Sequence, residues 1–186
     1  CYANGNDNSP VHPVDFSMPA KSVGHGVTTT ADIARCEDAK PILLELAQDI
    51  GKRLTAQKKY ALKISVNARS SKLQNTCWQT DLPIATRSPM IIADTAYRLF
   101  CESYDRINPV RSLTVTAFSL VDSGTVCQSD LFTDTARLDK MEKVDRCILD
   151  IRNRFGDGMI KNAVLMSGLA VPKSKAVVSL PGSMLT

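Results

Sequence analysis

Apolar and polar residues alternate in four stretches of this 186-residue chain. These stretches are residues 21–30, residues 60–71, a segment around Trp78, and residues 111–120. A period of two places every second side chain on the same face of a β-strand, so the pattern predicts four half-buried strands. In the second stretch the predicted buried face consists of Leu62, Ile64, Val66 and Ala68.

Three other segments repeat apolar residues at helical spacing. The first predicted helix covers residues 38–55, with Asp38 as its cap and Pro41 in its first turn, where proline is tolerated. A second helix is expected to begin after Ser88, which is a favourable N-cap residue. The third predicted helix covers residues 137–155.

The order over residues 21–121 is therefore strand, helix, strand, strand, helix, strand. We predict an α+β fold, in which a four-stranded antiparallel sheet carries two helices on one face and a C-terminal helical extension follows. The other face is expected to be bare and rich in Ser, Thr, Lys and Arg, which suits phosphate contacts. No aromatic residue is placed on that predicted face, which disfavours base stacking and sequence-specific recognition of single strands.

Two glycines interrupt the first predicted strand, at Gly24 and Gly26. Glycine leaves the backbone open to close approach, so one interpretation is a smooth surface for a ligand. The alternative is a sheet edge with a bulge.

The distribution of charge is more informative than the net charge of +4. Residues 50–80 contain no Asp or Glu, and their basic residues are Lys52, Arg53, Lys58, Lys59, Lys63, Arg69 and Lys72. Such a segment favours a polyanion on one face, whereas the alternative is an ordinary solvated surface.

Several other chemistries lack the residues they need. The six cysteines lie 20 or more residues apart, which excludes CxxC metal motifs and favours reduced thiols in a cytoplasm. With only His12 and His25 present, a hydrolase triad or a Cys-His pair is disfavoured, and His25 is interpreted as a hydrogen-bonded strand residue. No run of about 18 apolar residues predicts a membrane span.

Seven short motifs together resemble a known family. They are "NGNDNSPV" (4–11), "KSVGHG" (21–26), "RSS" (69–71), "WQ" (78–79), "PVRSLTV" (109–115), "QSDLF" (128–132) and "IRNRFG" (151–156). In this order they resemble the C-terminal part of a Y-family translesion DNA polymerase of the UmuC/DinB (ImpB/MucB/SamB) group, over roughly residues 2–166. Because the chain starts with Cys, we expect it to be cut from a longer protein.

The resemblance and the residue patterns together imply five segments. They are the end of the thumb and a linker (1–20), the little finger domain (21–122), a linker with a clamp-binding motif (123–136), a C-terminal helical segment (137–167) and a flexible tail (168–186).

By the resemblance, the little finger grips primer-template DNA across the major groove for an error-prone, lesion-bypass polymerase of the SOS response. Catalysis in this family needs palm carboxylates that hold two Mg²⁺ ions. The acidic residues here form no strand-borne cluster, so we expect no catalysis and no cofactor in this chain. The expected partners are primer-template DNA, the rest of the polymerase chain and the replication sliding clamp, without a membrane.

Residue by residue, the resemblance assigns phosphate contacts to the first strand, the hairpin and the last strand. Together with Lys63 on the polar face, the predicted DNA-binding residues are Lys21, Ser22, Gly24, Arg69, Ser70, Ser71, Lys72, Arg111 and Ser112. Arg111 lies two residues before the buried Leu113, so in a regular strand both side chains point to the buried face. Arg111 therefore reaches the open face only if the strand begins irregularly. Trp78 is expected to anchor the core instead of stacking on bases.

The "QSDLF" stretch resembles the peptide by which this family binds the sliding clamp. Its residues are Gln128, Ser129, Asp130, Leu131 and Phe132. Two adjacent apolar anchors in an extended segment form a small hot spot. The alternatives are that Leu131 and Phe132 pack on this chain, and that the whole protein is a non-enzymatic adaptor recruited to the clamp. Steep salt dependence separates phosphate binding from an apolar protein contact.

Overall fold

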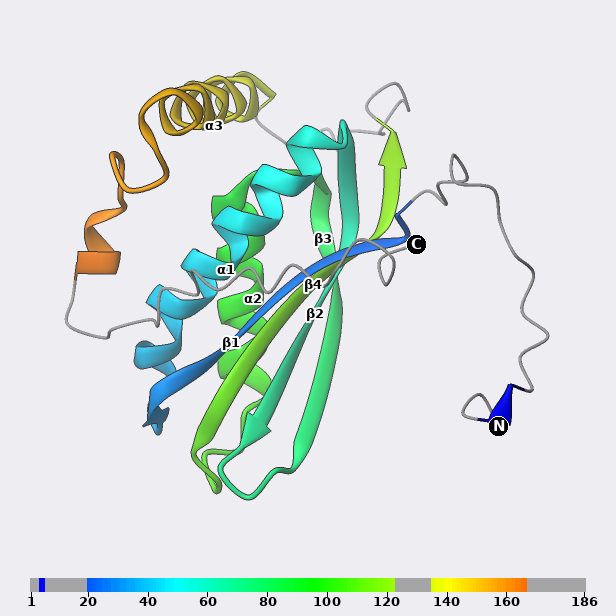
Figure 1. Ribbon diagram of the computed structural model, residues 1–186, viewed down its shortest axis with the longest axis vertical. Coiled ribbons are helices and arrows are strands. Elements are labelled where there is room, and N and C mark those ends of the chain that lie inside the picture. Colours follow the sequence, from blue (N-terminus) through cyan, green and yellow to red (C-terminus); the bar gives the residue numbers. More distant parts are fainter. Residues whose placement is uncertain (1–3, 6–19, 123–134, 167–186) are drawn as a thin grey trace. The chain divides into compact units, whose positions relative to one another are not determined.

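A four-stranded antiparallel sheet with two helices on one face dominates the structure (Figure 1). The computed structural model describes residues 4–5, 20–122 and 135–166. Its elements are β1 (Ser22–Ile33), α1 (Cys36–Ala56), β2 (Lys59–Ser70), β3 (Asn75–Thr86), α2 (Pro89–Ser103), β4 (Val110–Asp122), α3 (Thr135–Phe155) and a 3₁₀ helix (Ala163–Met166). The predicted fold class and element order are confirmed.

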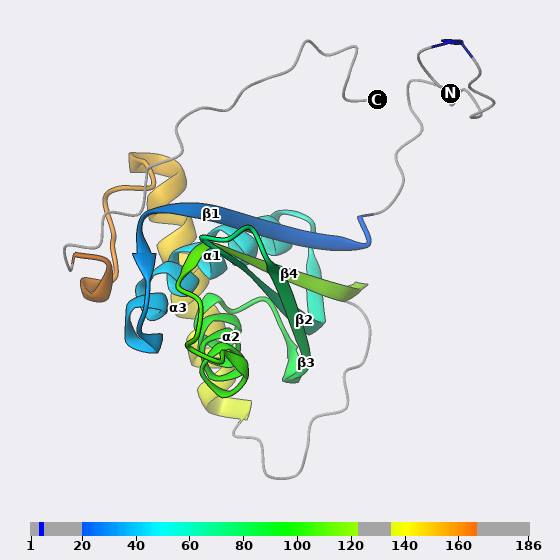
Figure 2. The ribbon, with the colours of Figure 1, turned by 90° about the horizontal axis from the view of Figure 1, so that it is seen from below.

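The strands lie in the order β1-β4-β2-β3, and every neighbouring pair is antiparallel. Helix α1 joins β1 to β2 and helix α2 joins β3 to β4, so each helix connects strands that are not neighbours. This is the split β-α-β arrangement. Figure 2 shows α1, α2 and α3 on the same side of the sheet. We call the opposite side, which none of these helices covers, the open face.

The core lies between the sheet and the two covering helices. Its largest fully buried side chains are Phe100, Ile33, Ile42, Leu43, Leu46, Ile50, Leu54, Ile64, Ile92, Leu113, Val66 and Val115. Burying each such side chain contributes about 1.5–3 kcal/mol, so this layer holds the sheet on its helices. Trp78 packs edge to face on Phe100 with ring centroids 6.2 Å apart, which confirms it as a core anchor.

Helix α1 begins earlier than the sequence pattern predicts. Arg35 is its N-cap, and Asp38 lies inside the first turn instead of capping it. Pro41 therefore lies beyond the first turn, although the helix continues to Ala56. Helix α3 likewise begins two residues before the predicted position, at Thr135.

The prediction that Leu62 is buried is wrong. The Leu62 side chain is 37% exposed, whereas Ala61 and Ile64 on either side are fully buried. The register between β2 and β3 shifts here, because Leu62 alone lies between Ala61 and Lys63, whereas four residues of β3, 82–85, lie between their partners Thr86 and Asp81. The extra residues of β3 make the pairing irregular and interrupt the alternation of β2 locally, which the sequence pattern does not reveal.

The two glycines of β1 make room for threonines on β4. A Cβ on Gly26 would lie 2.3 Å from Thr114 Oγ1, and a Cβ on Gly24 would lie 2.8 Å from Thr116 Oγ1. Strand β1 is also an edge strand, and its register shifts after Thr28. The sheet-edge interpretation of these glycines is therefore correct in part, and their immediate role is packing within the sheet.

Helix α3 is held to the helix side of the sheet by polar contacts. Glu142 pairs with Arg87 and accepts a hydrogen bond from Tyr60 Oη at 3.1 Å, while Ser88 Oγ donates to Asp145 Oδ2 at 2.6 Å. A cavity of about 200 Å³ lies under these contacts. Within the described ranges no helix is long and apolar enough to cross a membrane.

The two carboxylates that hold α3 respond to burial in opposite ways. Burial raises the pKa of Asp145 above its ordinary value of 3.8, and the Ser88 hydrogen bond only partly offsets this. Burial also tends to raise the pKa of Glu142, but the hydrogen bond and charge of Arg87 outweigh it and hold that pKa below 4.5. Ionised Glu142 therefore stabilises the docked helix, whereas ionisation of Asp145 opposes docking.

Substituting Gly26 should strain the sheet. We expect Gly26→Ala to lower the free energy of unfolding by about 1–3 kcal/mol, because the new Cβ overlaps Thr114 Oγ1. Chemical denaturation measures this change. Adding Thr114→Ala should recover part of the loss, whereas Gly158→Ala, with only Lys161 Cε at 4.0 Å, should change little. An unchanged stability in Gly26→Ala would contradict the close packing.

Removing the charge of Glu142 should loosen α3 at neutral pH. The Glu142 contribution is present above its unfolded pKa of 4.5 and is lost as pH falls through the lowered folded value. We expect Glu142→Gln to reduce hydrogen-exchange protection of α3 by about 0.5–1 kcal/mol at neutral pH, a size appropriate to a part-exposed pair. The difference from wild type should shrink as pH falls below 4.5 and vanish once Glu142 is protonated in the folded protein. Glu102→Gln on α2, an exposed position, is the matched control.

Candidate nucleic-acid interface

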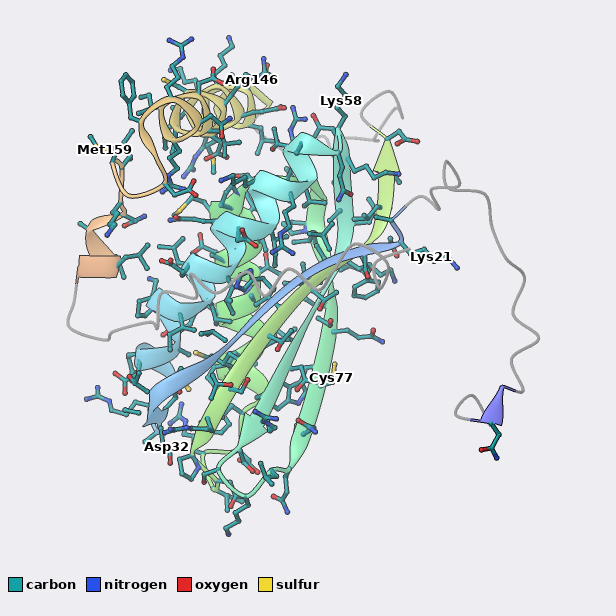
Figure 3. All side chains as sticks on the ribbon, in the orientation of Figure 1. Lys21, Asp32, Lys58, Cys77, Arg146 and Met159 are labelled. Atoms are coloured by element: carbon teal, nitrogen blue, oxygen red, sulfur yellow. The ribbon has the colours of Figure 1, made fainter. Side chains whose placement is uncertain are left out.

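The strand register arranges the residues of the open face in four rows. In order from the β2-β3 hairpin, the rows are Thr28, Ser112, Arg69 and Asn75; Gly26, Thr114, Asn67 and Cys77; Gly24, Thr116, Ser65 and Gln79; Ser22, Phe118, Lys63 and Asp81. Figure 3 shows Cys77 on β3 pointing away from the helices. The rows run across all four strands, so they form one continuous surface.

The two middle rows are neutral and hydrogen-bonding. They combine the hydroxyl groups of Thr114, Thr116 and Ser65 with the amides of Asn67 and Gln79. On each strand these residues occupy the alternate positions that face away from the helices, as Lys63 and Arg69 do on β2. The alternation of polar residues in the sequence is the signal that identifies them. A surface of hydroxyls and amides can donate to phosphate oxygens without adding charge.

Two basic residues mark the hairpin end of the open face. Arg69 lies in the first row, and Lys72 is exposed in the turn that follows. In the described part of the chain neither side chain forms an ion pair. Ser71 is exposed beside them, and its backbone N–H donates to the carbonyl of Pro109 at 3.0 Å. Arg69 and Lys72 are therefore available to an anion.

Ser70 differs from the other predicted hairpin residues. It is 7% exposed, and its Oγ accepts a hydrogen bond from the Gln74 backbone N–H at 3.2 Å. The Leu73 N–H also donates to the Ser70 carbonyl at 3.0 Å. The Ser70 hydroxyl thus orders the turn that presents Arg69 and Lys72, and it does not lie open on the surface.

Arg111 reaches the surface because the strand is irregular at this point. The register between β2 and β4 shifts between Arg69 and Ser70, which leaves Arg111 as the extra residue. Its Nη1 donates to Asp32 Oδ1 at 3.1 Å and to the Thr30 carbonyl at 3.2 Å. The strand is therefore irregular, as an outward-pointing Arg111 requires, but the charge of Arg111 is already paired with Asp32.

The neighbouring Ser112 is also engaged within the sheet. It lies on the open face, opposite Thr28 on one side and Arg69 on the other. Its Oγ donates to the carbonyl of Val27 at 3.0 Å. The hydroxyl oxygen retains capacity as an acceptor, while its proton is committed to β1.

The far end of the open face carries Lys21, Ser22 and Lys63. Lys21 immediately precedes β1 and is exposed, and Figure 3 shows it at the end of β1 opposite Asp32. Lys63 lies in the fourth row, and its Nζ is 3.0 Å from Asp81 Oδ1 on β3. Each end of the face therefore has one cation bound to a carboxylate and at least one cation without such a partner among the described residues.

The basic residues of the acid-free segment do not all lie on one face. Lys52 and Arg53 belong to α1 and pair with Asp157 and Asp49. Lys59 pairs with Asp122 Oδ1 at 3.3 Å. Residues outside the segment thus supply the carboxylates that it lacks, and folding divides its cations between the helix side and the open face.

The prediction that the open face has no aromatic residue is also wrong. Phe118 lies in the fourth row between Ser22 and Lys63 and is half-buried. The alternation of the predicted strand already indicates this, because Phe118 has the parity of Thr114 and Thr116 and its neighbour Ala117 is fully buried. The described rows contain one aromatic side chain, fewer than the pair or triplet of stacking residues in sheets that read single-stranded RNA.

His25 has a structural hydrogen bond, as its interpretation from the sequence requires. Its Nδ1 is 2.6 Å from Asp49 Oδ2, which also lies 2.8 Å from Arg53 Nη2. Arg53 in turn donates to the Gly24 carbonyl at 3.2 Å. Among the described residues no three His, Cys, Asp or Glu side chains lie close enough together to hold a metal ion.

The "QSDLF" motif, Gln128–Phe132, lies outside the described residues, as does most of the "NGNDNSPV" motif. Their assignments remain predictions from the sequence.

Comparison with known proteins gives a consistent family. A profile of the impB/mucB/samB family C-terminal domain matches residues 20–131. DNA polymerase IV of Acetivibrio thermocellus is 32% identical over 165 residues, which cover 89% of this chain and 41% of that protein. DNA polymerase IV of Clostridium acetobutylicum is 33% identical over 168 residues, covering 89% of this chain and 40% of that protein. The chain therefore spans about two fifths of these relatives.

A solved structure of a Y-family DNA polymerase chimera, Dbh-Dpo4, has the same fold. It superposes with a TM-score of 0.51 at 17% sequence identity, over 64% of this chain and 33% of that chain. The superposed portion supports the sheet and helix arrangement described above. By its family profile and its relatives, the chain belongs to the impB/mucB/samB family C-terminal domain, the little finger of Y-family DNA polymerases.

Proposed function

We propose that the open face grips the backbone of primer-template DNA as the little finger of a lesion-bypass DNA polymerase. The observation that carries this proposal is the continuous polar face with cations at both ends and hydroxyls, amides and glycines between them. Phosphate contacts of this kind hold a duplex without reading its sequence. That property suits an enzyme that must continue past damaged bases.

The spacing of the two cationic ends supports a duplex as the ligand. Arg69 and Lys63 lie six residues apart on β2, which corresponds to about 20 Å along a strand. The major groove of B-DNA is about 12 Å wide. The two ends can therefore meet different backbones while the neutral middle rows lie over the groove.

Catalysis and recruitment belong to other parts of the proposed assembly. In this proposal nucleotidyl transfer and its Mg²⁺ ions reside in the palm of the full polymerase, and this domain contributes none of the reacting groups. The "QSDLF" peptide docks the polymerase on the sliding clamp by its Leu131 and Phe132 side chains. The chain then acts in the cytoplasm during translesion synthesis.

Binding to DNA should depend on the unpaired cations of the hairpin end. We expect Arg69→Ala with Lys72→Ala to weaken binding to a fluorescent primer-template duplex by about tenfold. The slope of log affinity against log salt should become shallower by about 1.8, the value for two lost phosphate contacts. Fluorescence anisotropy at two salt concentrations measures both quantities.

The matched control for this experiment is Lys140→Ala with Lys143→Ala. It removes the same charge from exposed positions on α3, on the helix side. An equal loss in both double variants would show nonspecific attraction only. Binding that does not respond to salt would instead favour the adaptor alternative, and absence of binding at low salt would refute the proposed grip.

Clamp binding should depend on the apolar pair of the "QSDLF" motif. We expect Leu131→Ala with Phe132→Ala to weaken binding to the purified sliding clamp by about 30-fold or more, the size of a hot-spot loss. Isothermal titration calorimetry measures this effect. Ser129→Ala with Asp130→Ala alters the intervening residues and should have little effect, and DNA binding should be unchanged in both. Equal clamp affinity in all three proteins would contradict the motif.

A further inference from the structure

The cations of the open face fall into two classes. Arg69 and Lys72 form no ion pair with a described residue, whereas Lys63 is held by Asp81. Asp81 lies directly opposite Lys63 in the register of β2 and β3. The two side chains are 47% and 74% exposed, so the pair stands at the surface where a ligand would arrive.

A phosphate and the Asp81 carboxylate require the same donors of Lys63. The lysine ammonium has three N–H groups, and its Nζ lies 3.0 Å from Asp81 Oδ1. An approaching phosphate would also meet the negative charge of the carboxylate. Asp81 therefore competes with a phosphate for Lys63 and repels it.

We propose that Asp81 is a built-in competitor that weakens the grip of the open face on DNA at the Lys63 end. The inference rests on the proposed DNA-binding function and adds regulation of its affinity. With Asp81 bound to it, Lys63 contributes little to affinity, so most of the affinity comes from Arg69, Lys72 and Lys21, which have no carboxylate partner among the described residues. A domain that must release and regrip a moving duplex gains a faster dissociation rate from this arrangement.

The Arg111–Asp32 pair at the hairpin end is a poorer candidate for such exchange. Arg111 also donates to the Thr30 carbonyl at 3.2 Å, so its guanidinium is fixed to β1 by two groups. The Lys63 ammonium has a flexible stem and a single carboxylate partner in the described ranges. Exchange of partner is therefore easier at Lys63.

The test is DNA binding by the Asp81→Asn variant. We expect about 2- to 5-fold tighter binding to the primer-template duplex at low salt, since an exposed ion pair contributes little stability to be displaced. The slope of log affinity against log salt should become steeper by up to about 0.9, the value for one additional phosphate contact.

Two comparisons separate competition at Lys63 from a general change of charge. Asp94→Asn makes the same change in net charge at an exposed position on α2 and should have a smaller effect. In a Lys63→Ala background, Asp81→Asn should lose most of its effect, because there is no ammonium left to release.

The outcomes distinguish this inference from the function on which it rests. Salt-dependent binding by wild type that Asp81→Asn does not strengthen beyond Asp94→Asn would overturn the competitor while leaving the DNA grip intact. The competitor would also be overturned if Asp81→Asn strengthened DNA binding by the same factor in the wild-type and Lys63→Ala backgrounds. Absence of binding by both wild type and Asp81→Asn at low salt would overturn the grip and the competitor together.

Discussion

Burial of one side of the sheet beneath α1 and α2 is the constraint on which the rest of the structure depends. Because alternate side chains of a strand point to opposite faces, Ile64, Val66, Leu113 and Val115 enter the core. Their neighbours along the same strands are thereby directed to the open face. The hydrophobic effect that holds the helices on the sheet also orders the polar rows of the candidate interface.

Pairing between strands determines the electrostatics of those rows. Positions 63 and 81 are distant along the chain but directly opposite in the β2-β3 register, which brings Lys63 to Asp81. The net charge of the domain therefore says little about its affinity for an anion. What matters is which cations, such as Arg69 and Lys72, have no carboxylate beside them in the described structure, because only those can bind phosphate without displacing another partner.

Bulges explain why particular residues depart from simple alternation. The register shift at Leu62 turns its side chain outward, and the shift beside Ser70 turns Arg111 toward Asp32. Phe118, by contrast, lies on the open face by regular alternation, opposite Ser22 and Lys63. Each departure changes the chemistry of the surface locally while the core and the strand order remain intact, since bulges insert a residue without breaking the sheet.

The sequence by itself determined the four strands, the three helices, their order and the parity of Ser65, Asn67 and Arg69. These features follow from periods of two and 3.6 residues, which are local properties of a chain. Only the tertiary structure decided that Lys63 and Arg111 are paired, that Ser70 is buried in a turn, and that Lys52 pairs with Asp157. Those outcomes depend on strand register and helix docking, which join residues far apart in sequence.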